Sequence, residues 1–164
     1  MPLLLARIDD RLIHGQVAHG WGRALRPTLL AIVSDGLRAR PDEAALYLLA
    51  APDGCEACVV SVDEAVAPGF RARVESARTI LLFPGTEEPL RLAEAGFPLP
   101  ALNVGGLHVA PGKREVLPWV WLDDGDVDRL RRLQALGARI EARDLPTNPP
   151  RSLGTVLEAE LPGS

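Results

Sequence analysis

The sequence predicts a single α/β domain over residues 1–164, built on an open, twisted, mainly parallel sheet of about six to seven strands with helices on both faces. Short runs of branched apolar residues recur along the chain. Each run is apolar on both faces, as a strand buried in a parallel sheet must be. Segments with helical signals separate the runs at about the length of one strand–helix unit, and this alternation places helices on both faces of a parallel sheet.

The predicted strands are brief and rich in branched residues. Five of them cover residues 3–8, 29–33, 58–62, 79–83 and 102–104. The C-terminal third is less regular, and two further strands are predicted there, over residues 115–122 and 139–143. In the first of these, Trp119 and Trp121 alternate, so they would share one face and either pack inside or form a self-association surface for a homo-oligomer.

The predicted helices carry start and stop signals. They cover residues 16–25, 41–51, 63–67, 86–95, 123–136 and, near the C-terminus, 155–159. Pro41 suits the first turn of its helix, and Gly96 is a good stop signal for the helix before it. Acidic residues open the segment 123–136 and arginines follow, which complements the helix dipole.

Composition excludes several classes of protein. The 164 residues are 47% hydrophobic and 24% charged, which is typical of a globular chain and not of a disordered one. No apolar run approaches the length of a membrane span, and the N-terminus lacks the pattern of a signal peptide, so we expect a cytoplasmic protein. The net charge is −4 and the basic residues are scattered, which argues against nucleic acid as a partner.

The two cysteines form a C-x-x-C pair, Cys55 and Cys58. Such a pair could be a redox couple or half of a zinc site. Zinc would need two more ligands, and no second C-x-x-C is present. Because Cys58 opens an apolar run that is typical of a buried strand, we interpret both cysteines as structural and expect no metal.

The loop after the first strand is the richest candidate for chemistry, since ligands of open α/β sheets bind beyond the carboxyl ends of the strands. His14 would lie just before the following helix, where free backbone N–H groups and the dipole attract anions and disfavour imidazolium. Arg11 could grip an anion, while Asp9 or Asp10 could orient the imidazole or Arg11. Gly15 lets the chain approach an anion closely.

Such a histidine suits phosphoryl transfer through phosphohistidine. The alternative is a charged surface loop with an ordinary histidine. A metal centre from Asp9, Asp10, His14 and His108 fits the spacing but has no positive signal.

The same loop resembles a known family. The string Arg-Ile-Asp-Asp-Arg-Leu-Ile-His-Gly-Gln-Val covers residues 7–17, and Trp21 follows seven residues after His14. This string resembles the IIB component of the mannose/fructose/sorbose family of the sugar phosphotransferase system (PTS). The resemblance continues over most of the chain, at residues 33–35, 49–52, 80–83, 90–92, 103–106 and 146–147.

The resemblance implies an activity, that of a protein-Nπ-phosphohistidine–sugar phosphotransferase. His14 would accept a phosphoryl group on Nδ1 from a phospho-IIA protein and pass it to a sugar held by the membrane components IIC and IID. Arg11 matches the arginine that binds the phosphoryl group, and the backbone around Ile13, Gly15 and Gln16 would cradle its oxygens. No metal or other cofactor is implied. The protein would then be cytoplasmic, or peripheral at the inner membrane through IIC and IID.

Residues at other strand ends complete the expected site. Asp35 would support the loop together with Asp9 and Asp10, and the rim would comprise Ser34, Gly85, Asn103, Gly105 and Gly106.

This sequence departs from the family pattern at three places. Ser34 replaces a usual asparagine, Pro84-Gly85 replaces a common Thr-Asn, and His19-Gly20 replaces two threonines. These changes bear on sugar specificity and transporter pairing, and leave the His14 loop whole.

Three functions remain open from the sequence. The first is a phosphocarrier in sugar uptake. The second is a regulatory phosphoprotein, phosphorylated on His14 but transferring nothing to sugar. The third is an anion-binding module in which His14 never becomes covalently modified. The sugar is selected by the membrane components and cannot be derived from this chain.

Overall fold

The computed structural model describes residues 3–153 and 157 and confirms the predicted α/β fold. One seven-stranded sheet has the order β3-β2-β4-β1-β5-β8-β9, in which the first six strands are parallel and β9 is antiparallel to β8. The strands are β1 (Leu3–Asp9), β2 (Leu29–Val33), β3 (Glu56–Val60), β4 (Thr79–Phe83), β5 (Ala101–Gly106), β8 (Arg139–Ala142) and β9 (Arg151–Ser152).

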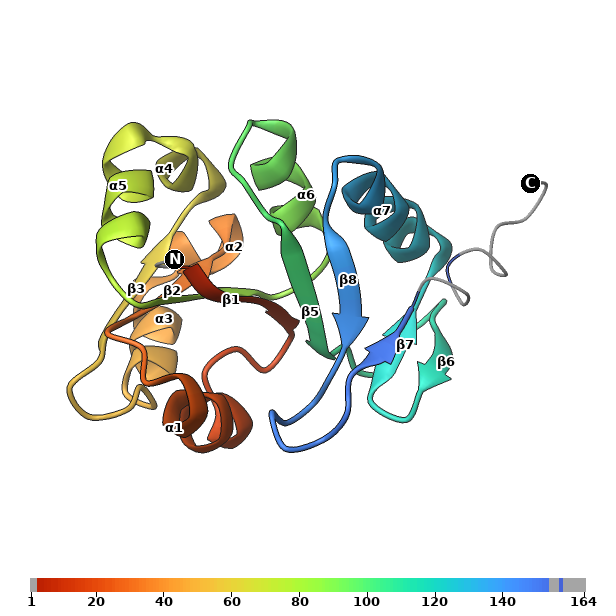
Figure 1. Cartoon of the computed structure of the whole chain (residues 1–164), viewed down its shortest axis with the longest axis horizontal. Helices are drawn as coiled ribbons and strands as arrows, with labels where there is room; N and C mark the ends of the chain where they lie inside the picture. The colour runs from red at the N-terminus through yellow and green to blue at the C-terminus, as the bar shows by residue number, and fades with distance from the viewer. Residues whose placement is uncertain (1–2, 154–156, 158–164) are drawn as a thin grey trace.

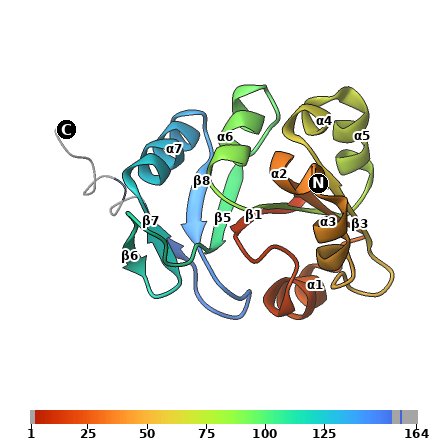
Figure 2. The same cartoon turned by 180° about the vertical axis from the view of Figure 1, so that it is seen from behind.

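Helices cover both faces of the sheet and enclose two apolar cores. On one face lie η1 (Gln16–Trp21), α1 (Gly22–Leu25), α2 (Asp35–Arg38) and α3 (Pro41–Leu48). On the other lie α4 (Val62–Val66), α5 (Pro68–Ser76), α6 (Glu87–Glu94) and α7 (Asp124–Ala135). Figures 1 and 2 show α4 to α7 along one side of the sheet and α1 and α3 along the other.

The central strands are buried because both of their faces meet a helix layer. In β4, Ile80 and Leu82 pack in the core beneath η1 and α3, while Leu81 and Phe83 pack in the core beneath α4 to α7. All four side chains are fully buried. This alternation explains why the strand is apolar at every position.

The third strand begins and ends two residues earlier than predicted, at Glu56–Val60. Ser61 does not continue the strand, because it is the N-cap of α4. Its hydroxyl accepts the N–H of Glu64, whose carboxylate in turn accepts the N–H of Ser61. This capping box ends the strand and begins the helix at one residue.

The prediction of one strand over residues 115–122 is wrong. The segment is an antiparallel hairpin of β6 (Arg114–Leu117) and β7 (Val120–Leu122), in a small sheet of its own. Pro118 lies in the turn, where its missing N–H costs no ladder hydrogen bond. Trp119 therefore sits at the turn and not on a continuous strand with Trp121.

Three short elements have weak sequence signals and were not predicted, namely α2, α5 and β9. The predicted helix 16–25 forms, but its first part, η1, is a π-helix. The predicted helix 155–159 lies, apart from Leu157, outside the described residues. None of the helices in the described part of the chain is long and apolar enough to cross a bilayer.

The two cysteines are free and pack in different cores. Cys55 packs with the core beneath η1 and α3, and Cys58 with the core on the opposite face of the sheet. Burial raises the pKa of both thiols. This placement agrees with the structural interpretation and not with a redox couple.

Truncation of a buried side chain on a central strand should destabilise the fold strongly. Leu82→Ala removes a fully buried side chain between two helix layers, and we expect a loss of about 2–5 kcal/mol in the free energy of unfolding, measured by urea denaturation. Leu46→Ala is the matched control, because Leu46 is 70% exposed and its truncation should stay within about 0.5 kcal/mol of wild type. Equal losses in the two variants would contradict the described core.

Candidate functional site

The His14 loop leaves the sheet at the carboxyl end of β1, between β4 and β5. The connection from β1 runs to η1 on one face, whereas the connections from β4 and β5 lead to α6 and α7 on the other face. In open α/β sheets, ligands usually bind where neighbouring loops diverge to opposite faces in this way.

Asp9 is the hub of this loop. Its side chain is fully buried, and Oδ1 accepts the backbone N–H of Arg11 at 3.1 Å. Its other oxygen, Oδ2, lies 3.1 Å from Nη2 of Arg7 and 2.9 Å from Nε2 of His14. Burial raises the pKa of Asp9, but the hydrogen bond from His14 and the charge of Arg7 outweigh it and hold that pKa below its ordinary value. The carboxylate is therefore ionised at neutral pH.

The contact with Asp9 assigns the tautomer of His14. An ionised carboxylate can only accept hydrogen bonds, so Nε2 of the neutral imidazole carries the proton. Nδ1 then keeps its lone pair, and the backbone N–H of Gln16 points at it from 3.4 Å at the start of η1. His14 is 19% exposed. Nδ1 of His14 thus faces the backbone N–H of Gln16 at the start of η1.

Arg11 and the space above Gly15 provide room and charge for an anion. The side chain of Arg11 is 40% exposed, lies 3.5 Å from Oδ1 of Asp9 through Nε, and donates from Nη2 to Oε1 of Gln16 at 2.9 Å. A Cβ built on Gly15 would meet no atom within 4 Å. The loop is therefore open at Gly15, and the partly exposed guanidinium of Arg11 lies on the same loop.

Two buried side chains anchor the loop beneath His14. Leu12 and Ile13 both pack in the core beneath η1. Leu12 has a left-handed backbone with φ of 57°, which costs about 1 kcal/mol in a residue with a side chain. Its N–H donates to the carbonyl of Asp9 at 3.0 Å. Ile13 therefore serves the site by anchoring the loop through its side chain.

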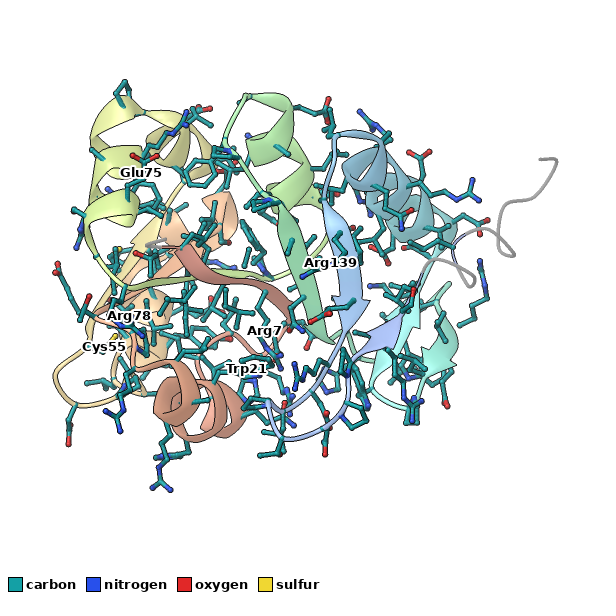
Figure 3. The ribbon with its side chains drawn as sticks, viewed as in Figure 1. Arg7, Trp21, Cys55, Glu75, Arg78 and Arg139 are labelled. Atoms are coloured by element: carbon teal, nitrogen blue, oxygen red, sulfur yellow. The ribbon has the colours of Figure 1, made fainter. Side chains whose placement is uncertain are left out.

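Arg7, near the end of β1, has a structural role in the site that the sequence did not predict, since its place next to the loop was the only signal. It is fully buried, and its guanidinium lies over the ring of Trp21, 5.4 Å from the centroid (Figure 3). Nη1 donates to Oδ1 of Asn103 at 2.6 Å. A Cβ on Gly105 would overlap the same guanidinium. Asn103 and Gly105 were expected at the rim of the site. They instead lie against the buried guanidinium of Arg7.

A second carboxylate–imidazole pair joins the loop to β5. Asp10 accepts the backbone N–H of His108 at 2.7 Å, its other oxygen lies 2.5 Å from Nδ1 of His108, and its own N–H donates to the carbonyl of Gly106. A Cβ on Gly106 would stand 3.3 Å from Oδ1 of Asp9, so its glycine allows the loop and β5 to lie close together. Asp10 therefore fixes the loop and makes its contacts away from His14.

The residues expected from the second and fourth strands find other partners. The hydroxyl of Ser34 accepts the N–H of Leu37 and caps α2. Asp35 accepts from Nη1 of Arg91 at 2.6 Å and from the N–H of Val62 at 2.8 Å. Both follow β2, which β4 separates from β1, and Gly85 follows β4 itself. The structure places all three along the same edge of the sheet, outside the cluster around Asp9.

Comparison with known families agrees with this geometry. The family model for the PTS system sorbose subfamily IIB component matches residues 3–161. The chain belongs to this IIB family. The sorbose-specific EIIB component of Lacticaseibacillus casei is 34% identical over 149 residues, which are 91% of each chain. The mannose-specific EIIAB component of Escherichia coli K12 is 36% identical over 149 residues, and this chain spans only about half of that longer protein, 46% of its length.

The IIB fold is also found in solved structures. The crystal structure of the IIBSor domain of the Klebsiella pneumoniae sorbose permease has a TM-score of 0.90 and 30% identity, covering 98% of this chain and 99% of that one. Because the likeness runs over both chains almost end to end, the sheet, the His14 loop and the β6–β7 hairpin all lie within a fold that the two proteins share.

Removal of the Asp9 charge should destabilise the IIB chain in a pH-dependent way. Asp9→Asn leaves Arg7 buried without its carboxylate, which should cost about 3–5 kcal/mol at pH 7. The pKa of Asp9 is depressed in the folded chain, so its stabilising effect is present above the unfolded value near 3.8 and is lost as pH falls through the folded value. The difference in the free energy of unfolding between Asp9→Asn and wild type should therefore narrow below about pH 4.

Denaturant titrations at pH 7 and at acidic pH measure this gap. Asp53→Asn is the control, because Asp53 is exposed and its change should stay within about 0.5 kcal/mol at both pH values. A gap that is independent of pH would show that the Asp9 charge is not the source of the stabilisation.

Proposed function

We propose that this chain, as one IIB unit over residues 1–164, is a phosphocarrier of sugar uptake. It accepts a phosphoryl group from a phospho-IIA protein onto Nδ1 of His14 and passes it to a sugar held by IIC and IID at the cytoplasmic side of the membrane. The observation that carries the proposal is the 2.9 Å contact between Nε2 of His14 and the buried carboxylate of Asp9. This contact leaves Nδ1 unprotonated, on the loop that also carries Arg11.

The contact with Asp9 suits both halves of a transfer. When Nδ1 attacks phosphorus, the N–P bond of the donor breaks and a new one forms on His14. The ring becomes positively charged because Nε2 keeps its proton, and Asp9 lies against that proton to stabilise the charge. When the phosphoryl group passes to a sugar hydroxyl, the N–P bond on His14 breaks and the ring returns to its neutral form with its Nε2 proton in place. The sugar hydroxyl releases its proton to the medium as the new O–P bond forms.

The oxygens of the phosphoryl group need donors of their own. Arg11 presents a planar set of N–H groups, and the N–H of Gln16 already faces Nδ1. These donors act from fixed positions on developing charge, which is the usual source of catalysis in phosphoryl transfer. Because Arg11 is 40% exposed, the group is held without being enclosed, as a carrier requires.

Family membership supports the identity of the partners. The E. coli relative is named as an EIIAB component, which joins a IIA and a IIB part in one protein. This name supports phospho-IIA as the donor. The relatives carry the names of several sugars, among them sorbose, mannose and fructose. A hexose is accordingly the class of acceptor that we propose.

Phosphorylation of His14 is the decisive test. The wild-type chain, incubated with phosphoenolpyruvate, Enzyme I, HPr and a IIA protein, should gain one acid-labile phosphoryl group by intact-mass analysis, and His14→Ala should gain none. His14→Ala should keep its fold by circular dichroism, since it loses two side-chain hydrogen bonds worth about 1 kcal/mol each. If the wild-type chain gains no phosphoryl group from a IIA protein that is itself phosphorylated, the anion-binding module is favoured. Membranes that contain IIC and IID then distinguish the other two functions, because only a phosphocarrier forms sugar phosphate on them and a regulatory phosphoprotein does not.

Loss of the Arg11 guanidinium should slow phosphoryl uptake without unfolding the chain. Arg11→Ala removes a charged donor from the loop of His14, and we expect a rate about 100-fold lower, as for other single donors to developing charge. Quenched-flow time courses of phosphoryl uptake from phospho-IIA measure the rate. Arg71→Ala is the control. Arg71 is exposed on α5, where it pairs with Glu75, and α5 lies on the face of the sheet opposite η1. An unchanged rate in Arg11→Ala would remove Arg11 from the phosphoryl site.

A further inference from the structure

Arg7 joins separate parts of the chain behind the nucleophile. Nη1 donates to Oδ1 of Asn103 on β5 at 2.6 Å and to the carbonyl of Arg143, after β8, at 2.8 Å. Nη2 donates to the carbonyl of Asp144 at 3.0 Å and to Oδ2 of Asp9 at 3.1 Å. These contacts fix the position of a cation that is fully buried.

One oxygen of Asp9 is shared between Arg7 and His14. Oδ2 receives Nη2 of Arg7 at 3.1 Å and Nε2 of His14 at 2.9 Å. Burial lowers the pKa of Arg7 and Asp9 partly restores it, but a guanidinium stays protonated throughout the neutral range. The oxygen of Asp9 that contacts His14 is thus permanently paired with a buried, immobile cation.

We propose that Arg7 is a positioning residue whose fixed charge keeps Asp9 ionised and turned toward His14, so that Nδ1 remains free for phosphoryl transfer. The inference rests on the proposed function of His14. Arg7 is fully buried, so it is shielded from a phosphoryl group that arrives from solvent and acts on the reaction through Asp9.

Loss of Arg7 should block Nδ1 through the Asp9–His14 pair. Without the cation, a buried carboxylate and an imidazole take up a proton together at a higher pH. The proton either converts His14 to imidazolium or neutralises Asp9, which then donates to Nε2 and leaves the ring proton on Nδ1. Both outcomes remove the lone pair of Nδ1.

The other charged groups near the pair cannot replace Arg7. Arg11 contacts the opposite oxygen of Asp9 and is 40% exposed, so water and salt weaken its influence. The charge of Asp144 lies beside Arg7 and not beside His14. The carboxylate of Asp10 is occupied by His108 on the β5 side.

Arg143 offers a matched control for Arg7. Both guanidiniums lie over the ring of Trp21, Arg143 at 5.8 Å from the centroid. The side chain of Arg143 donates to the carbonyls of Pro146 and Asn148, whereas only that of Arg7 pairs with Asp9. Replacement of either arginine by methionine removes one cation from Trp21, but only one replacement touches the carboxylate behind His14.

The test measures the pH profile of phosphoryl uptake in Arg7→Met, Arg7→Lys and Arg143→Met, with a phosphorylated IIA protein as donor. Arg7→Met should be up to about 10-fold slower than wild type at pH 6.5, and the difference should shrink by pH 8.5. The reason is that, without the Arg7 cation, the Asp9–His14 pair keeps an added proton to a higher pH, so less of Nδ1 is unprotonated at acidic pH. Arg7→Lys keeps a cation beside Asp9 and should restore the wild-type profile. Arg143→Met should keep it.

Nitrogen NMR of the imidazole gives a readout that needs no partner. In wild type at neutral pH, the Nδ1 signal of His14 should lie in the unprotonated range, and in Arg7→Met it should move to the protonated range. If the wild-type chain is never phosphorylated but the Nδ1 signal still moves in Arg7→Met, the proposed function is overturned. The role of Arg7 in keeping Nδ1 unprotonated is then supported on its own. A phosphorylated wild type without this change in Arg7→Met would overturn the role of Arg7 alone.

A parallel loss of rate at every pH, or an equal change in Arg143→Met, would also overturn the proposal, because it would mark a purely structural effect. Should Arg7→Met fail to fold, Gly105→Ala replaces it. The added Cβ overlaps the guanidinium and displaces Arg7 without removing its charge. It should move the Nδ1 signal in the same direction, and a folded Gly105→Ala with a wild-type signal would contradict the inference.

Discussion

The buried ion pair between Arg7 and Asp9 is the interaction on which the site depends. The two residues alternate on β1, so their side chains leave the strand on the same face. A buried charge is tolerated only when it is paired and its remaining groups are hydrogen-bonded. Asp9 meets this demand with His14 and the N–H of Arg11, and Arg7 meets it largely with acceptors from β5 and from the chain after β8. The loop is therefore held in place from several sides.

Much of the architecture could be predicted because strands buried on both faces leave a clear apolar signal. The hairpin at residues 114–122 could not, since the turn signal of its proline was outweighed by the apolar run around it. Within the site, Asp9, Arg11 and His14 lie on one loop, and their proximity follows from the chain itself. Asp35 and Ser34 were expected nearby, but the order of strands in a sheet is a tertiary property, and β4 separates their strand from β1. Arg7 was given no role because its acceptors come from distant segments.

The site divides into a rigid buried part and an open part. Arg7, Asp9 and Asn103 are almost completely shielded from water, and they set the orientation of the imidazole. Arg11 and Gly15 face outward, where a partner and a phosphoryl group can approach. This division suits the carrier function that we propose, in which a phosphoryl group arrives from one partner and leaves to another. Orientation is provided once, by the chain, and the open side is left to whichever partner is bound.

The open space at Gly15 also bears on the lifetime of the phosphorylated form that we propose. A phosphoryl group on His14 would lie next to a position that water can reach, because Gly15 is exposed and a Cβ built on it would meet no atom within 4 Å. The charged carrier would then have a lifetime fixed by spontaneous hydrolysis, and each transfer succeeds only when the acceptor docks within that interval. Flux would depend on the local concentration of partners as much as on the reactivity of the histidine.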